Sequence, residues 1–201
     1  MLLRTILLAT MFAFGSVTTL AQRDGRSAIP NASPEFEYKL LATSRTTTME
    51  REMNQAAAAG YQFEDVISGS TFFGGAEALV VMSHRIGEGS QQRYEYKLLA
   101  TSKTSTMQKE LQVAGDAGYQ HKGQSVFKKT FGTEVMVILE RDRDATPVLW
   151  EYKLLATRKT STMQSEMLAA SNNGYQFVGF TTGETFFGGT EVVTIMRRPR
   201  R

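Results

Sequence analysis

The apolar positions along the chain repeat one pattern three times. An alternating stretch, EYKLLAT, occurs at Glu37–Thr43, Glu95–Thr101 and Glu151–Thr157. Each copy is followed by a Thr/Ser-rich step, a Met-led segment with apolar residues every three or four positions, a Gly-Tyr pair and two further apolar stretches. Alternation predicts a strand, and the longer spacing predicts an amphipathic helix. The sequence therefore predicts one β-α-β-β unit written three times.

The units occupy residues 36–86 (repeat 1), 94–142 (repeat 2) and 150–198 (repeat 3), with polar linkers between them. Residues 22–35 contain glycine and prolines without apolar periodicity, and we interpret them as a flexible leader. Residues 1–21 form a short apolar run with one positive charge before it and small residues at its end, as in a cleavable signal peptide. The alternative is a transmembrane anchor, for which the run is short. We expect an exported protein, periplasmic or secreted.

Both ends of each helix carry sequence signals. A hydroxyl residue precedes Glu or Gln by three positions at each expected start, which predicts a capping box; the pairs are Thr47/Glu50, Ser105/Gln108 and Ser161/Gln164. A glycine stands at each expected end, where a left-handed residue is common; these are Gly60, Gly118 and Gly174. The tyrosine after each glycine is expected to pack back on the helix.

The third stretch of each unit is apolar on both faces, so we expect it at the centre of its sheet, antiparallel to both neighbours. The helix would cover one face. The other face, carrying Leu41, Leu99 and Leu155, needs cover from elsewhere. The predicted fold class is α+β, with small antiparallel or mixed sheets, one helix on each, packed together sheet to sheet. The alternative is three independent beads on linkers.

Composition excludes several functions. The chain has no cysteine, hence no disulfide or thiolate metal site, and its net charge is +3, which implies no nucleic-acid partner. Four arginines, Arg197, Arg198, Arg200 and Arg201, form a basic tail, expected to be solvated or to contact an anionic envelope surface weakly. No later stretch is long and apolar enough to span a membrane.

Catalytic signatures are missing from the sequence. The two histidines, His84 and His121, occupy unrelated positions without metal-ligand spacing, so we expect ordinary surface histidines. There is no Gly-x-Ser-x-Gly elbow, phosphate loop or dinucleotide fingerprint. We therefore expect no catalytic residue, metal or cofactor, and enzymatic activity is undecided, leaning against.

Two groups of residues are candidates for a ligand or partner surface. Phe73 and Phe187 lie in Phe-Phe-Gly-Gly turns and could be exposed anchors, or could be buried between repeats. Glu77, Glu134 and Glu191 open the third strand of each unit. Together they could form a cation or sugar site, or they could be solvated separately.

The three cores resemble a family of short bacterial proteins called domain of unknown function 4177, whose members look like Tyr-Glu-Tyr-Lys, a helix, Gly-Trp-Glu-Leu-Val and a hairpin ending in a basic residue. The matching stretches here are 36–39, 94–97 and 150–153, each followed by its Gly-Tyr pair and by a basic hairpin end at Arg85, Arg141 and Arg197-Arg198. Tyr replaces Trp, and Gln replaces Glu. The resemblance implies a small α+β fold and no known activity.

Two functions follow as hypotheses. The first is an exported, non-enzymatic repeat protein that binds a partner or self-assembles through sheet surfaces. The alternative is a small-molecule or carbohydrate-binding protein, possibly a hydrolase, with a pocket between repeats lined by the candidate glutamates and phenylalanines.

Overall fold

Each repeat folds into a three-stranded sheet with one helix. The computed structural model describes residues 35–70, 76–88, 92–128, 133–184 and 190–200. Repeat 1 contains β1 (Phe36–Thr43), α1 (Thr46–Ala58), β2 (Gln62–Ser70) and β3 (Ala76–Arg85). Repeat 2 contains β4 (Tyr94–Thr101), α2 (Thr104–Asp116), β5 (Gln120–Lys128) and β6 (Thr133–Asp142). Repeat 3 contains β7 (Trp150–Thr157), α3 (Thr160–Ser171), β8 (Gln176–Glu184) and β9 (Thr190–Pro199).

The third strand of each repeat lies at the centre of its sheet. The strand orders are β1-β3-β2, β4-β6-β5 and β7-β9-β8, and every pairing is antiparallel. This confirms the α+β class and the predicted position of the third strand. Its apolar character on both faces is explained by cover on both sides: Val137 and Ile138 point to opposite faces and are both fully buried.

The helices end as predicted. Gly60, Gly118 and Gly174 have φ angles of 87°, 82° and 82°, in the left-handed region. In repeat 1 the amide of Tyr61 donates to the carbonyl of Ala56, and the amide of Gly60 donates to Ala57. This pair of bonds is a Schellman motif, and repeats 2 and 3 have the same one.

The capping-box prediction is wrong. The N-cap residues are Arg45, Lys103 and Lys159, and none of them makes a side-chain capping bond. The preceding turn is held instead by the hydroxyl of Thr43, which accepts from the amide of Arg45 at 3.1 Å, with the same bond in the other repeats. Glu50 and Gln108 are used elsewhere, in contacts between repeats.

The prediction of which sheet face needs external cover is also wrong. Leu99 packs against its own helix with Met107 and Leu111, and Leu155 packs with Met163. The opposite face of each sheet, which carries the tyrosine of the first strand, is the one that needs cover from outside the repeat. Side chains alternate along a strand, so the two sets cannot share a face.

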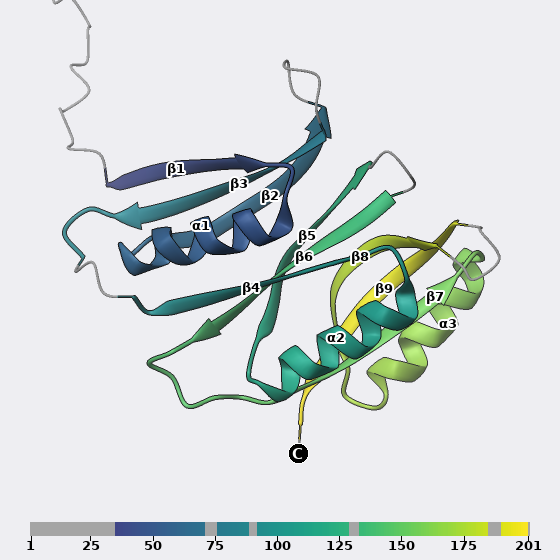
Figure 1. Ribbon diagram of the computed structural model, residues 1–201. Helices are drawn as coiled ribbons and strands as arrows, with labels where there is room; N and C mark the ends of the chain where they lie inside the picture. Colours follow the sequence, from purple (N-terminus) through teal and green to yellow (C-terminus); the bar gives the residue numbers. More distant parts are fainter. Residues whose placement is uncertain (1–34, 71–75, 89–91, 129–132, 185–189, 201) are drawn as a thin grey trace, which may run out of the picture. The chain divides into compact units, whose positions relative to one another are not determined.

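In repeats 2 and 3 the preceding repeat provides that cover, mainly through its helix. Helix α1 contacts both β1 of its own sheet and β4 of the next, and α2 likewise contacts β4 and β7 (Figure 1). Strands β2 and β5, and β5 and β8, also meet. Sheet-to-sheet packing alone is therefore not confirmed, because a helix lies between consecutive sheets.

The repeats share their cores. One buried cluster combines Met49 and Met53 of α1 with Tyr96, Leu98 and Ile138 of repeat 2. Residues Pro34–Arg201 consequently form one compact unit by their contacts. The alternative of independent beads does not fit a core that crosses the boundary between repeats.

The predicted signal peptide and most of the leader lie outside the described residues. Among the helices of the described part, none is long and apolar enough to cross a membrane.

Candidate interaction surface

The boundary between repeats 1 and 2 is organised by Tyr96, and we call it the first junction. Tyr96 leaves β4 toward α1 and β2 and is only 2 % exposed. Its hydroxyl oxygen accepts from the amide of Phe63 at 2.8 Å, and its O–H group donates to the carboxylate of Glu140 at 3.0 Å. Burial raises the pKa of Tyr96, and the neighbouring Glu140 carboxylate raises it further. The tyrosine therefore stays a neutral hydrogen-bonding anchor.

The boundary between repeats 2 and 3, the second junction, repeats this arrangement. Tyr152 is 3 % exposed, and its hydroxyl accepts from the amide of His121 at 2.7 Å. It donates to the carbonyl of Tyr119 at 3.2 Å. Burial likewise raises the pKa of Tyr152. The same tyrosine position thus serves both junctions.

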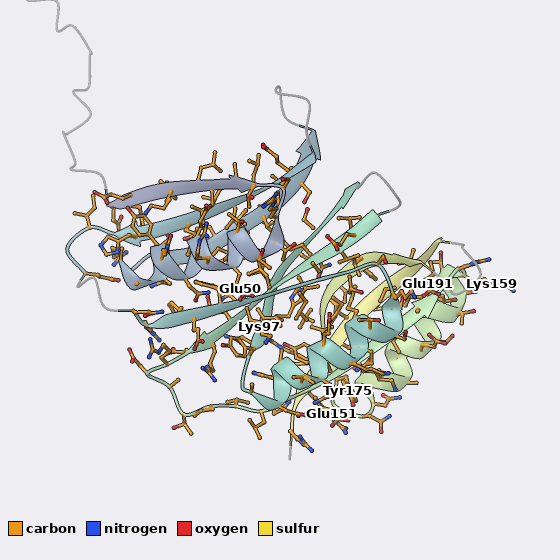
Figure 2. The ribbon with its side chains drawn as sticks, in the orientation of Figure 1. Glu50, Lys97, Glu151, Lys159, Tyr175 and Glu191 are labelled. Carbon is orange, nitrogen blue, oxygen red and sulfur yellow. The ribbon has the colours of Figure 1, made fainter. Side chains whose placement is uncertain are left out.

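Helix side chains pair with the open edge of the next sheet. In the first junction the amide of Leu98 donates to Glu50 at 2.7 Å, while Asn54 accepts from the amide of Tyr96 and donates to its carbonyl. Figure 2 shows Glu50 on the side of α1 that faces β4. These bonds satisfy backbone groups that an edge strand otherwise leaves unpaired.

The second junction uses glutamines for the same bonds. Gln108 accepts from the amide of Leu154 at 2.7 Å and donates to the carbonyl of Tyr152 at 2.9 Å. Gln112 accepts from the amide of Tyr152 at 3.0 Å. Equivalent positions of the repeats thus perform equivalent bonds, and this explains why the expected cap residues are not caps.

In repeat 1, at one end of the row of three repeats, no described residue covers the sheet face that carries the first-strand tyrosine. The equivalent tyrosine of repeat 1, Tyr38, is 69 % exposed, and Leu40 is 64 % exposed. Ile67 is exposed beside them, and Leu79 and Val81 are half-exposed, whereas their counterparts in repeats 2 and 3 include fully buried residues such as Ile138 and Ile195. We call this set the outer face: Tyr38, Leu40, Ile67, Leu79 and Val81.

At the other end, α3 contacts its own strands β7 and β8 and presents an apolar groove. The groove has a volume of about 560 Å³. It is lined by residues of α3 and β8 that occupy the positions covering Tyr96 and Tyr152 in the junctions. We call it the α3 groove, and its lining includes Thr160, Gln164, Leu168, Phe177 and Phe180. Leu168 is 60 % exposed and Phe180 is 52 % exposed.

A second, polar hollow of about 730 Å³ lies around the C-terminal end of α3. Its charged residues are already paired: Arg198 bonds Glu151 at 2.8 Å, and Arg200 bonds Asp116 at 2.6 Å. Tyr175 also donates to Glu151, and Figure 2 shows the two side chains together. The hydrogen bond from Tyr175 and the ion pair with Arg198 lower the pKa of Glu151. This cluster ties the first strand to the helix end.

The basic tail is therefore partly tied to the fold. Besides the pairs of Arg198 and Arg200, the guanidinium of Arg197 lies 4.4 Å from the ring centre of Trp150. Arg201 lies outside the described residues. Arg197 and Arg198 thus make contacts within repeat 3, and Arg200 joins repeat 3 to α2 of repeat 2.

The structure describes three of the five candidate residues from the sequence. Phe73 and Phe187 lie outside the described residues. Glu77, Glu134 and Glu191 are half-buried at the starts of three different sheets, and none lines the two hollows described above. Glu191 accepts from the hydroxyl of Thr104 at 2.8 Å, across the second junction. Within the described ranges, no three His, Cys, Asp or Glu residues are grouped as metal ligands.

His121 is not the surface residue that we expected. It is 8 % exposed at the second junction, where Gln124 bonds its ring, and burial lowers its pKa to about 4. His84 is half-buried and lies 3.2 Å from the carbonyl of Gly60. Alignment of the repeats would have given a signal, since Phe63 and Phe177 stand at the position of His121.

Comparison of the chain with models of protein families, with curated proteins and with solved structures found no match. The two junctions, the outer face and the α3 groove are the features that bear on function.

Proposed function

We propose that this chain is an exported, non-enzymatic repeat protein that works by binding another polypeptide through the ends of its repeat stack. The observation that carries the proposal is the α3 groove, an apolar surface whose counterparts on α1 and α2 each hold a first strand with its tyrosine. Exposed apolar patches of this kind mark interaction sites.

The favoured binding mode is addition of an extended segment. In both junctions the bound element is a strand whose tyrosine is buried and whose backbone is bonded by helix side chains. Backbone bonding supplies affinity and a side-chain pocket supplies specificity, as in other modes of strand recognition. An extended partner segment with an aromatic residue fits the α3 groove in the same way.

Membership of the domain of unknown function 4177 family is part of the proposal. It is supported by the β-α-β-β order and by the Gly-Tyr pair at each helix end. Since that family carries no known activity, it adds no catalytic residue.

A synthetic peptide with the sequence of Tyr94–Thr101 tests the proposal. The peptide copies β4, which lies on α1 in the chain, and we expect it to bind saturably to the purified protein, measured by fluorescence anisotropy. Leu168→Glu should abolish the binding because it places a charge in the apolar groove. The matched control is Val113→Ser, which changes an exposed apolar residue of α2 and should leave binding intact. Absence of saturable binding contradicts the proposal.

A further inference from the structure

We infer that the occupant of the α3 groove is the outer face of a second copy of this chain, giving a head-to-tail contact between molecules. This inference rests on the proposed binding function and names its partner. It continues the two internal junctions, in which the helix of one repeat covers the tyrosine-bearing sheet face of the next.

The two ends complement each other by position. Tyr38 and Leu40 of the outer face correspond to Tyr96 and Leu98, which the first junction buries to 2 % and 7 % exposure. In the chain they have no covering helix among the described residues, because α1 lies on the opposite face of that sheet. The α3 groove, conversely, is a helix surface that corresponds to the covering surfaces of α1 and α2. No sheet of a following repeat packs against it among the described residues.

Polar groups also correspond. Gln164 occupies the position of Gln108, so its side chain can accept from the amide of Leu40 in the second copy as Gln108 accepts from Leu154. The hydroxyl of Thr160 occupies the position of Thr104, which donates to Glu191. The corresponding carboxylate of the second copy is Glu77, which gives one of the sequence candidates a role.

The groove extends far enough for these contacts. A second apolar hollow of about 270 Å³ adjoins it at the start of α3, and the two share Thr160, Met163 and Phe180. The contact surface therefore follows α3 from its first turn to its last. This is the length over which α1 and α2 bond their strands.

The contact between copies differs from the internal junctions at one place, where β8 of one copy would meet β2 of the next. A Cβ on Gly123 would lie 2.8 Å from the ring of Phe63 and 3.2 Å from Val66, so glycine allows close approach in the first junction. A Cβ on Gly179 would lie closer still to the side chain of Gln124 in the second junction. These glycines follow the bulge of β5 and β8, where the register shifts.

Repeat 1 carries Asp65 at this position, and in the second copy it would face Phe177 and Phe180. The exposed Asp65 carboxylate accepts a hydrogen bond from the amide of Val66 at 2.7 Å, and placing its charge against two aromatic rings desolvates it, so it opposes the contact. The contact between copies is consequently weaker than the internal junctions, and removal of this side chain should strengthen it. Gln112 is also replaced at α3, by Leu168, which exchanges one polar bond for apolar contact.

When the α3 groove of one copy binds the outer face of another, the first copy still has a free outer face and the second a free groove. Further copies can therefore add, and the assembly grows as a filament or closes as a ring. This distinguishes it from a symmetric dimer, in which one surface meets its own copy. The distinction makes the inference testable with variants that damage one end at a time.

The experiment is sedimentation velocity of the purified exported protein over a concentration series. We expect concentration-dependent species larger than a dimer. Tyr38→Ser and Leu168→Glu should each be monomeric alone, because each lacks one end. Mixed in equal amounts they should form a heterodimer that grows no further, since the intact outer face of one meets the intact groove of the other. Val113→Ser should behave like the unchanged protein.

A further variant, Asp65→Gly, is expected to associate more tightly than the unchanged protein. It should tighten association by roughly tenfold or more, since removing a charge that the contact would desolvate is worth more than about 1.4 kcal/mol. The peptide with the sequence of β4 should dissociate the assemblies by competing for the groove. Circular dichroism of every variant verifies that the monomeric ones are folded.

Several outcomes overturn the inference. If Leu168→Glu still dimerises alone, outer faces pair with each other; if Tyr38→Ser does, the grooves pair with each other. If the unchanged protein and Asp65→Gly both stay monomeric while the peptide binds, the binding function stands and its partner is a different polypeptide or the leader at residues 22–35. If the peptide also fails to bind, the proposed function fails with it.

Discussion

The hydroxyl oxygen of Tyr96 accepts a hydrogen bond from the backbone amide of Phe63, 2.8 Å away and 33 residues earlier in the chain. The bond crosses the first junction, and both groups are buried. It fastens the first strand of repeat 2 to the second strand of repeat 1. The stability of one repeat therefore depends on a side chain of the next.

Removal of this hydroxyl gives the first prediction. Tyr96→Phe leaves the amide of Phe63 without its partner in a buried site, and we expect a loss of about 1–3 kcal/mol in the free energy of unfolding. The measurement is urea denaturation followed by circular dichroism. Tyr38→Phe is the matched control, because Tyr38 holds the same position in repeat 1 and is 69 % exposed. Equal effects of the two substitutions would contradict the assigned role of the junction.

The exchange between glutamate and glutamine in the junctions gives the second prediction. Glu50 accepts from the amide of Leu98, and Gln108 accepts from Leu154 in the same way. Only an acceptor oxygen is required, so Glu50→Gln should leave the free energy of unfolding within about 0.5 kcal/mol, whereas Glu50→Ala should lower it by about 1 kcal/mol. Thermal unfolding curves of the two variants compare them directly, and a costly Glu50→Gln would show that the charge matters.

A helix-end glycine gives the third prediction. Gly174 has a φ of 82°, and no heavy atom lies within 4 Å of where its Cβ would stand, so Gly174→Ala tests backbone conformation without a steric clash. We expect a loss of about 1 kcal/mol in the free energy of unfolding. Gly69→Ala is the control, since Gly69 also has open space but no positive φ. A neutral Gly174→Ala would argue against the left-handed turn.

The sequence was sufficient for the order of elements within a repeat. Apolar residues on both faces of Val135–Leu139 placed that strand at the centre, and Gly118 marked the end of a helix, because both signals depend on local geometry. The Thr/Ser-x-x-Glu/Gln pattern predicted capping boxes wrongly because of contacts between repeats. Glu50 and Gln108 have better partners on the next repeat than on their own helix end.

The candidate surface could not be predicted because identical motifs have different surroundings. Tyr38, Tyr96 and Tyr152 lie in the same EYKLLAT motif, yet only the second and third are buried. Whether a tyrosine is covered depends on a preceding repeat, and the described residues include no repeat before repeat 1. The single sequence signal for this difference is Asp65, which replaces the glycine found at the same position in repeats 2 and 3.

The buried histidine gives the last prediction, a pH dependence of stability. Burial lowers the pKa of His121 from 6.5 to about 4, so the folded protein holds this ring neutral. Between pH 6.5 and about 4 the unfolded chain binds a proton at this histidine that the folded chain does not, and the free energy of unfolding therefore falls as the pH falls through that window. His121→Phe removes the effect while keeping the residue that repeats 1 and 3 have at the same position. Urea unfolding at pH 7 and pH 4.5 should show a pH-dependent loss that is smaller in the variant by roughly 1–3 kcal/mol. An unchanged difference between the two pH values would mean that other groups, such as the Glu151 carboxylate whose pKa is lowered by Tyr175 and Arg198, account for the acid sensitivity.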